Sequence, residues 1–372
     1  MTWIETTLGE VLPLKYGKNL PATKRSHSGE FDVVTSAGIV DSHFKPLVTQ
    51  PSVVIGRKGT IGSLTYCAEP CWPTDTTFFT TGSDAYDVRF GYYFLQTVPL
   101  AEMNNDSAVP GLNRGEAEAL PIRIPELSEQ KRISRLLGSL DDKIAANKKT
   151  IQQLDLLRRA SWQRNLQDGA VPKPLSSLAS FVNGGAFTKN ATGTGRVVVR
   201  ITEMTGGIGK STVRNDLDVP ANQVVHNGDL LFSWSGTLAV KRWPLGEAIV
   251  NQHIFKVIPD RDFPAVYLDC AIDQQLDYFK MIAAGKATTM GHIKRSDLDA
   301  NVEIPVRIRE ADLQLGGSLW DTAVSFEKEN LTLAKTRDEL LPLLMSGKIT
   351  VKEAEQEASA AGEDIVSEEN KA

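Results

Sequence analysis

Two groups of residues have the types and spacing that could support chemistry. Cys67 and Cys71 are four residues apart, as two zinc ligands can be, but no second cysteine pair and no His-x-His accompanies them. The segment GGIGKS (206–211) resembles the end of a phosphate-binding loop, which also requires a glycine where Met204 stands. We therefore predict no metal site at the cysteines and interpret GGIGKS as a polar turn between strands.

The remaining signatures of catalysis are missing from the sequence. There is no nucleotide-binding GxGxxG, no Ser/His/Asp motif context and no pair of carboxylates in a recognisable site. The five histidines show no ligand spacing; they are His27, His43, His226, His253 and His292. We therefore expect a binding protein that is not an enzyme and that carries no cofactor and no metal of its own.

The chain repeats itself, and the repeat must position whatever residues do the binding. Segments of the first half recur in the same order in the second, with an offset that drifts from 167 to 180 residues, as loop insertions would produce. Chance similarity between two α/β domains is the alternative reading. The matched segments are 52–61 with 229–238, 75–79 with 251–255, 108–125 with 288–305, 138–142 with 317–321, and the surroundings of Gly17 with those of Gly184.

Each repeat is predicted to be a mixed α/β (α+β) domain. Runs such as SVVIG and DLLFSW are rich in β-branched and aromatic residues, as strands are, and helical stretches lie between them. Because strands and helices do not alternate regularly, we expect an irregular, mostly antiparallel sheet instead of a doubly wound parallel one.

A long helix is predicted after the first repeat. Over residues 127–165 it would extend about 58 Å. Apolar residues recur at alternating spacings of four and three, which is the seam of a coiled coil, and Asn147 and Arg158 are its polar members. The seam consists of Ile133, Leu137, Leu140, Ile144, Asn147, Ile151, Leu154 and Arg158.

A second long helix with the same spacing follows the second repeat. Asn330 and Arg337 are its polar seam members, and Pro342 should loosen its last turns. Since both seams are of similar length, we predict that the helices pair within the chain as an antiparallel coiled coil with pseudo-two-fold symmetry. The alternative is that each helix packs on its own domain. The second seam consists of Leu319, Ala323, Phe326, Asn330, Leu333, Arg337, Leu340 and Leu344.

Composition sets the remaining bounds. The net charge of −5 comes from the last 21 residues, which hold two lysines and seven acids and leave 39 basic and 39 acidic residues elsewhere (41 − 2 and 46 − 7). Three cysteines indicate no disulfide framework, and no apolar run is long enough for a membrane span. The first residues lack the pattern of a secretory signal. We expect a cytoplasmic protein with no membrane contact.

These patterns divide the chain into five predicted parts. Two globular domains alternate with two helices, and a polar, acidic tail without aromatic residues is expected to be disordered. The boundaries are 1–125 for the first domain, 126–167 for the central helix, 168–308 for the second domain, 309–350 for the C-terminal helix and 351–372 for the tail.

Several of these segments resemble a known family. The helical region resembles that of the specificity (S) subunit of type I restriction-modification systems, and the strand-loop segments resemble its target recognition domains. The resemblance covers residues 1–351. The segments that carry it are PELSEQKRISRLLGSLDDKIAANKKTIQQLDLLRRASWQ (125–163), TRDELLPLLMSGKITV (336–351), IGRKGTIG (55–62), GDLLFSWSGT (228–237) and VNQHIF (250–255).

The resemblance implies a role in defence against foreign DNA. Each target recognition domain would read one half of a bipartite, asymmetric site in double-stranded DNA, and the paired helices would set the unread spacer. The helices would also dock two methyltransferase (M) subunits, and the complex would recruit restriction (R) motor subunits. Adenine N6-methylation and ATP-dependent cleavage, with S-adenosylmethionine, ATP and Mg²⁺, would belong to those partners.

Equivalent loops of the two repeats are then the candidate DNA contacts. Arginine and lysine can read guanine or hold phosphate, and threonine or tryptophan can supply apolar contacts. For each residue a solvated surface charge or a turn position is the competing reading. The candidates are Arg57, Lys58 and Thr60 with Trp234, Ser235 and Thr237; Asn113 and Arg114 with His292 and Lys294; and the basic residues Lys24, Arg25, Lys241 and Arg242.

The rival function is a coiled-coil scaffold whose globular ends bind proteins instead of DNA. The acidic total charge favours it. Binding of specific duplex DNA together with methyltransferase subunits would separate the two readings.

Overall fold

The computed structural model describes residues 3–103, 111–285 and 291–358. Tertiary contacts divide the chain into two compact units: unit 1 comprises residues 1–143 and 332–372, and unit 2 comprises residues 144–331. The long helices α4 (Leu127–Gln167) and α7 (Glu310–Met345) therefore contribute to both units. The predicted helices 126–167 and 309–350 correspond to α4 and α7, and each is shared between the two units.

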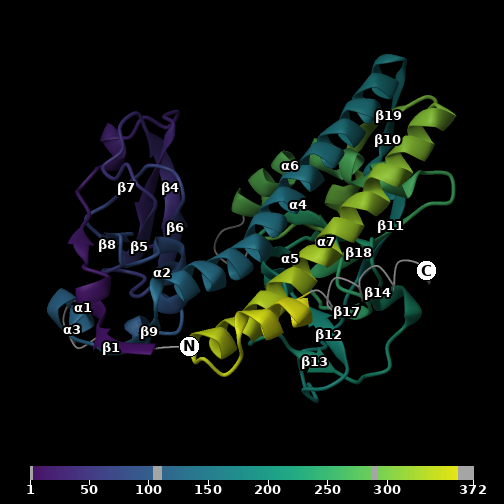
Figure 1. Cartoon of the computed structure of the whole chain (residues 1–372). Helices are drawn as coiled ribbons and strands as arrows, with labels where there is room; N and C mark the ends of the chain where they lie inside the picture. The colour runs from purple at the N-terminus through teal and green to yellow at the C-terminus, as the bar shows by residue number, and fades with distance from the viewer. Residues whose placement is uncertain (1–2, 104–110, 286–290, 359–372) are drawn as a thin grey trace. The chain divides into compact units, whose positions relative to one another are not determined.

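The described residues of unit 1 form two small sheets and a short two-stranded ladder. The first sheet is wholly antiparallel, with the order β2-β8-β5-β6, and α2 packs against β5 and β6 (Figure 1). The second has the order β4-β3-β7, in which β3 and β7 are parallel. The strands are β1 (Trp3–Thr7), β2 (Lys15–Tyr16), β3 (Phe31–Thr35), β4 (Gly38–His43), β5 (Ser52–Gly56), β6 (Leu64–Cys67), β7 (Cys71–Pro73), β8 (Thr77–Thr81) and β9 (Pro121–Pro125), and the helices are α1 (Leu8–Val11), η1 (Ala22–Lys24), α2 (Val88–Leu95), η2 (Leu100–Glu102) and α3 (Arg114–Glu118).

Unit 2 repeats this plan. Its antiparallel sheet has the order β11-β18-β15-β16, and its second sheet, β13-β12-β17-β14, again contains one parallel pair, β12 and β17. The strands are β10 (Ala170–Pro174), β11 (Ala179–Asn183), β12 (Arg196–Val199), β13 (Arg214–Asn215), β14 (Val224–Val225), β15 (Leu230–Ser233), β16 (Ala239–Arg242), β17 (Ala248–Val250), β18 (Ile254–Pro259) and β19 (Asn301–Pro305), and the helices are η3 (Leu175–Ser177), α5 (Ile201–Gly206), η4 (Ala221–Gln223), η5 (Ala265–Tyr267), α6 (Leu268–Gly285) and η6 (Arg295–Asp299).

A five-residue antiparallel ladder closes each repeat. In unit 1, β1 pairs with β9 so that Trp3 lies opposite Pro125. In unit 2, β10 pairs with β19 so that Ala170 lies opposite Pro305. Pro125 and Pro305 end the segments that the sequence repeat aligned, so the mixed, mostly antiparallel fold with an internal repeat is confirmed.

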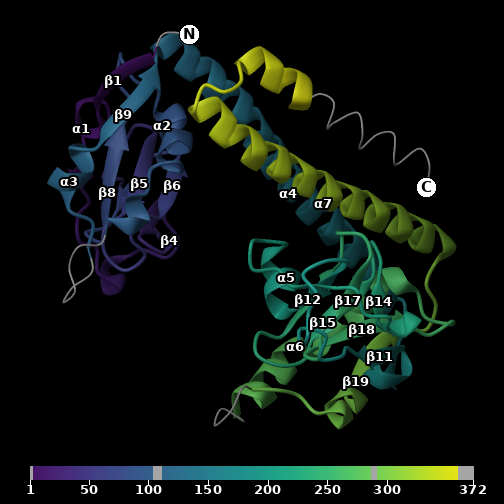
Figure 2. The same ribbon diagram turned by 90° about the horizontal axis from the view of Figure 1, so that it is seen from below.

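The two long helices run antiparallel within each unit. In unit 2 they lie side by side (Figures 1 and 2), and Asn147 near the middle of α4 bonds Glu329 while Asn165 near its end bonds Asp312. In unit 1, Asp141 of α4 pairs with Arg337 of α7. Every residue of the predicted seams is buried or half-buried.

The helices also pack on the domains, so the two packing alternatives for them are not exclusive. Ile133 and Leu137 of α4 and Leu340 and Leu344 of α7 share one core cluster with Phe90 of α2. In unit 2, Trp162 of α4 and Trp320 of α7 join the cluster that contains the domain residues Phe263 and Tyr267. The apolar face of each helix is therefore wider than a two-position seam.

The end of α7 and the segment after it differ from the expected tail. Beyond α7, Gly347 has φ +69°, a left-handed conformation that favours glycine, and it lies against the Trp3 ring. Residues 351–358 are helical, and Val351 and Ala354 are buried in the core of unit 1. The prediction of a disordered tail from residue 351 was therefore wrong for residues 351–358. The rest of the predicted tail, 359–372, lies outside the described residues.

Candidate nucleic-acid interface

In unit 1, two loops that are distant in the sequence meet at one end of the antiparallel sheet. The Leu112 amide donates a 2.9 Å hydrogen bond to the Arg57 carbonyl, and Lys58 and Gly111 form an isolated antiparallel bridge. Arg57 directly follows β5, and Arg114 begins α3. The chain therefore brings Arg57, Lys58 and Arg114 together on a backbone that main-chain hydrogen bonds hold.

Arg57 lies over two aromatic rings. Its guanidinium carbon lies 5.0 Å from the centre of the Tyr16 ring and 5.6 Å from that of Phe78. Arg114 approaches the same Tyr16 ring, at 5.6 Å, and its Nε lies 3.4 Å from Glu118. Tyr16 is 51 % exposed, so its ring orients the arginines without being covered by the core.

Tyr16, which lies against both arginines, was not among the candidates from the sequence. It directly precedes Gly17, which the repeat had marked, and this position was the available signal. Gly17 admits no side chain, since a Cβ there would lie 2.1 Å from the Thr74 carbonyl oxygen. The glycine allows β2 to approach the 73–74 backbone closely, and this approach places Tyr16 beside Phe78 in the ladder.

Unit 2 builds the same backbone arrangement. The Ile293 amide donates a 3.1 Å hydrogen bond to the Trp234 carbonyl, and Ser235 and His292 form the matching antiparallel bridge. Gly59 in unit 1 and Gly236 in unit 2 both adopt positive φ, +77° and +67°. In the Gly-Thr pair of each loop, the turn therefore requires the glycine, because positive φ favours glycine.

The side chains on this shared backbone differ. The register of the two sheets places Trp234 where Arg57 stands, Asn183 where Tyr16 stands, and Phe255 where Phe78 stands. The Trp234 ring stacks on Phe255, with ring centres 5.8 Å apart, and its Nε1–H donates to the Asn183 side-chain oxygen at 2.9 Å. An arginine over aromatic rings in unit 1 is thus replaced by a stacked indole in unit 2.

Two histidines surround the indole of unit 2. The centres of the His253 and His292 rings lie 5.6 and 6.4 Å from that of Trp234. His253 was not among the candidates, although it lies in the repeated segment 251–255.

The second pair of loops is aligned one residue away from its sequence match. Sequence similarity placed Lys294 opposite Arg114, but α3 begins at Arg114 and η6 at Arg295. Lys294 therefore corresponds to Asn113, the residue before the helix. Asn113 caps α3 by accepting hydrogen bonds from the Gly115 and Glu116 amides, so its side-chain oxygen already has a structural role.

The other candidates lie at various depths. Lys24 is exposed at the end of η1, whereas Arg25 donates to the Leu20 carbonyl. Ser235 is only 3 % exposed, and the structure shows it in the backbone bridge to His292. The exposed candidates are Lys24, Lys58, Thr60, Asn113, Arg114, Thr237, Lys241 and Lys294.

Arg242 is corrected as a candidate contact. Its side chain is only 7 % exposed, donates to both oxygens of Asp155 at 2.6 and 2.9 Å, and reaches Glu327 at 3.0 Å. Its guanidinium carbon lies 4.7 Å from the centre of the Trp320 ring. Arg242 thus joins β16 to α4 and α7, and its charge is used inside the protein.

A buried charge cluster surrounds this contact. Arg158 of α4 lies 5.0 Å from the same Trp320 ring centre and bonds both oxygens of Asp269 on α6. Burial alone would raise the pKa of Asp155, but the hydrogen bonds and charges of Arg242 and Arg158 outweigh it and lower that pKa. The cluster therefore remains charged and fixes the domain on the helix pair.

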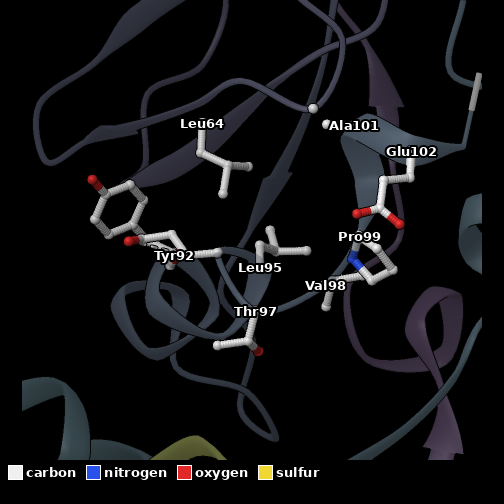
Figure 3. A pocket seen from close by; sticks show the side chains of 10 residues that line it. Leu64, Tyr92, Leu95, Thr97, Val98, Pro99, Ala101 and Glu102 are labelled. Carbon is white, nitrogen blue, oxygen red and sulfur yellow. Dashed lines mark hydrogen bonds between the residues drawn. The ribbon is translucent and has the colours of Figure 1, made fainter. Parts of the chain in front are cut away.

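An open hollow in unit 1 does not belong to these loops. Figure 3 shows Leu64 and Tyr92 on one side of it and Val98, Pro99 and Glu102 on the other. It lies beside α2 and η2, and Tyr16, Arg57 and Arg114 are not among its lining residues.

Within the described ranges, no group of three or more His, Cys, Asp or Glu side chains is arranged to hold a metal. None of the described helices has the length and apolar character of a membrane span.

Comparisons with known proteins gave one family match and several similar structures. Residues 1–156 match the family described as the type I restriction modification DNA specificity domain. The fold is similar to that of the type I restriction-modification S subunit from M. genitalium, with a TM-score of 0.59 and 14 % identity over 92 % of this chain and 96 % of that one. The HsdS subunit from Thermoanaerobacter tengcongensis matches with a TM-score of 0.32 and 13 % identity, over 93 % of this chain and 97 % of that one.

A search of curated proteins found no significant match. The family match and the fold similarity confirm the resemblance found in the helices and strand-loop segments.

Proposed function

We propose that this chain, whose residues 1–156 match the type I restriction modification DNA specificity domain, is the DNA-reading subunit of a type I restriction-modification complex. The loops of unit 1 read one half of a bipartite, asymmetric duplex site, and those of unit 2 read the other half. The helix pair sets the unread spacer and docks the methyltransferase subunits. The chain itself recognises DNA and catalyses nothing.

One observation carries this proposal. The same backbone bridge occurs in both units, yet it presents Arg57 over Tyr16 in one and Trp234 beside Asn183 in the other. A scaffold that served only stability would not require such different side chains at matched, half-exposed positions. Two recognition loops that share a backbone conformation but present different side chains suit two different half-sites.

The partners follow from the same assignment. Two methyltransferase subunits would supply adenine N6-methylation from S-adenosylmethionine, and restriction subunits would supply ATP- and Mg²⁺-dependent cleavage. These subunits also supply much of the phosphate contact, since the chain outside its acidic tail is electrically neutral.

The test uses the full chain in complex with its methyltransferase subunits. Duplexes selected from a randomised pool should share two specified segments separated by an unspecified gap of fixed length. Arg57→Ala should relax one segment, and Trp234→Ala should relax the other. Matched controls are Arg123→Ala, an exposed arginine on β9, and Tyr278→Ala, a 46 % exposed aromatic residue on α6.

The proposal fails if one substitution alters both segments or if the selected motif is continuous. Capture of protein partners without any selection among duplexes would instead support the scaffold reading.

A further inference from the structure

The guanidinium of Arg57 has hydrogen-bond donors that a ligand could use. Among the described residues, no carboxylate lies within ion-pair distance of Arg57, and its guanidinium donates a long 3.4 Å hydrogen bond to the Asp75 carbonyl. Arg89, Arg158 and Arg242 are paired with aspartates at 2.5–2.6 Å. The N–H donors of Arg57 thus remain available although its position is restrained.

The Tyr16 and Phe78 rings, inclined at 65° to each other, lie against this guanidinium and restrict its position. A fixed fork loses less conformational entropy on binding than a free side chain and selects ligands that accept two parallel hydrogen bonds. In duplex DNA, the O6 and N7 atoms of guanine in the major groove present such a pair, and phosphate oxygens present another.

The residue at the matched position in unit 2 helps to decide between guanine and phosphate as the ligand of Arg57. Trp234 cannot neutralise a phosphate, and its single N–H is already donated to Asn183. A phosphate contact is independent of sequence and would be equally useful in both halves, whereas a base contact has to differ between unlike half-sites.

We infer that Arg57 determines specificity by reading a guanine in the half-site of unit 1. This inference rests on the proposed function. Tyr16 acts as a positioning residue that keeps the guanidinium in the plane of the base. Trp234 presents a stacked indole at the matched place, so the half-site of unit 2 is read there without a guanine-specific fork.

The experiment again uses the full chain with its methyltransferase subunits and the selected duplex. Arg57→Ala should abolish the preference for guanine at one position and leave every other position unchanged. Replacing that guanine by 7-deazaguanine removes N7 and should weaken binding of the unaltered protein about tenfold. The Arg57→Ala complex should bind both duplexes equally.

Two further variants keep the inference testable if Arg57→Ala perturbs folding. Arg57→Lys retains the charge but not the fork, so it should lose most of the preference at that position. Tyr16→Leu should lower the preference at the same position, which a purely structural role would not do selectively.

A uniform loss of affinity for all sequences, with a salt dependence smaller by about one ion, would identify Arg57 as a phosphate contact and overturn the inference. Preference for another base at the affected position would also overturn it. In both cases the bipartite motif itself would persist, whereas failure of the proposed function would remove the motif altogether.

Discussion

Asn147 on α4 donates a 2.6 Å hydrogen bond to Glu329 on α7, at a seam position where Asn147 is only 3 % exposed. A buried amide at such a position specifies the alignment of paired helices because any other register leaves it without a partner. Its contribution therefore lies in specificity as well as in stability.

Asn147→Ala should lower the free energy of unfolding by about 1.5–3 kcal/mol, since a buried hydrogen bond to a charged group is lost. Denaturant unfolding measures the change. In a double-mutant cycle with Glu329→Ala, which removes the acceptor, the two effects should be less than additive. Lys149→Ala, exposed on the same helix, is the control. Full additivity would show that the two side chains do not interact.

Arg242→Met should destabilise the protein by about 2–4 kcal/mol, because the partly buried carboxylates of Asp155 and Glu327 would lose the arginine that pairs with both. Its neighbour Lys241 is exposed, so Lys241→Met should change stability by less than about 0.5 kcal/mol. The denaturation midpoints of these adjacent substitutions provide a matched comparison. Equal effects would contradict the structural role of Arg242.

Val351→Ala should cost about 2 kcal/mol, because Val351 is 1 % exposed and the substitution leaves a cavity in the core of unit 1. Lys352→Ala, next to it and exposed, serves as the control. Thermal unfolding gives the comparison. If the two variants unfold alike, residues after 350 do not pack as described.

The Arg89–Asp142 ion pair predicts a pH-dependent effect in unit 1. Hydrogen bonds from Arg89 lower the pKa of Asp142 in the folded state, so the stabilisation is present above the unfolded-state pKa and is lost as the pH falls through the folded-state pKa. Asp142→Asn should cost up to about 1 kcal/mol at pH 7, since the carboxylate is exposed, and almost nothing in strong acid. Unfolding midpoints at several pH values test this, and a constant difference would refute it.

Cys270 on α6 should be inert in the folded protein. Burial raises the pKa of its thiol to about 12, so almost no thiolate exists at pH 8. Iodoacetamide should modify Cys270 only after unfolding, as measured by mass spectrometry of its peptide. A cysteine introduced at exposed position 149 is the positive control. Rapid modification of the native protein would show that α6 is not covered by α4.

The repeat and the helix seams could be predicted because they depend on local patterns. Alternating spacings of four and three place Ile133 and Leu137 on one helix face regardless of the rest of the chain. Likewise, Gly59 and Gly236 belong to a turn that needs positive φ, so matching segments indicated matching loops. These features follow from periodicity and from the conformations that a residue type allows.

The site itself required the tertiary structure. Lys241 and Arg242 are adjacent basic residues, yet one is exposed and the other is enclosed by α4 and α7, because successive strand residues face opposite sides and only packing decides which side is covered. Tyr16 meets Arg57 across 41 residues of sequence, and no local pattern encodes that contact. The sequence by itself thus determined the two repeats and their paired helices, whereas long-range packing decided which charged side chains stay exposed on the surface.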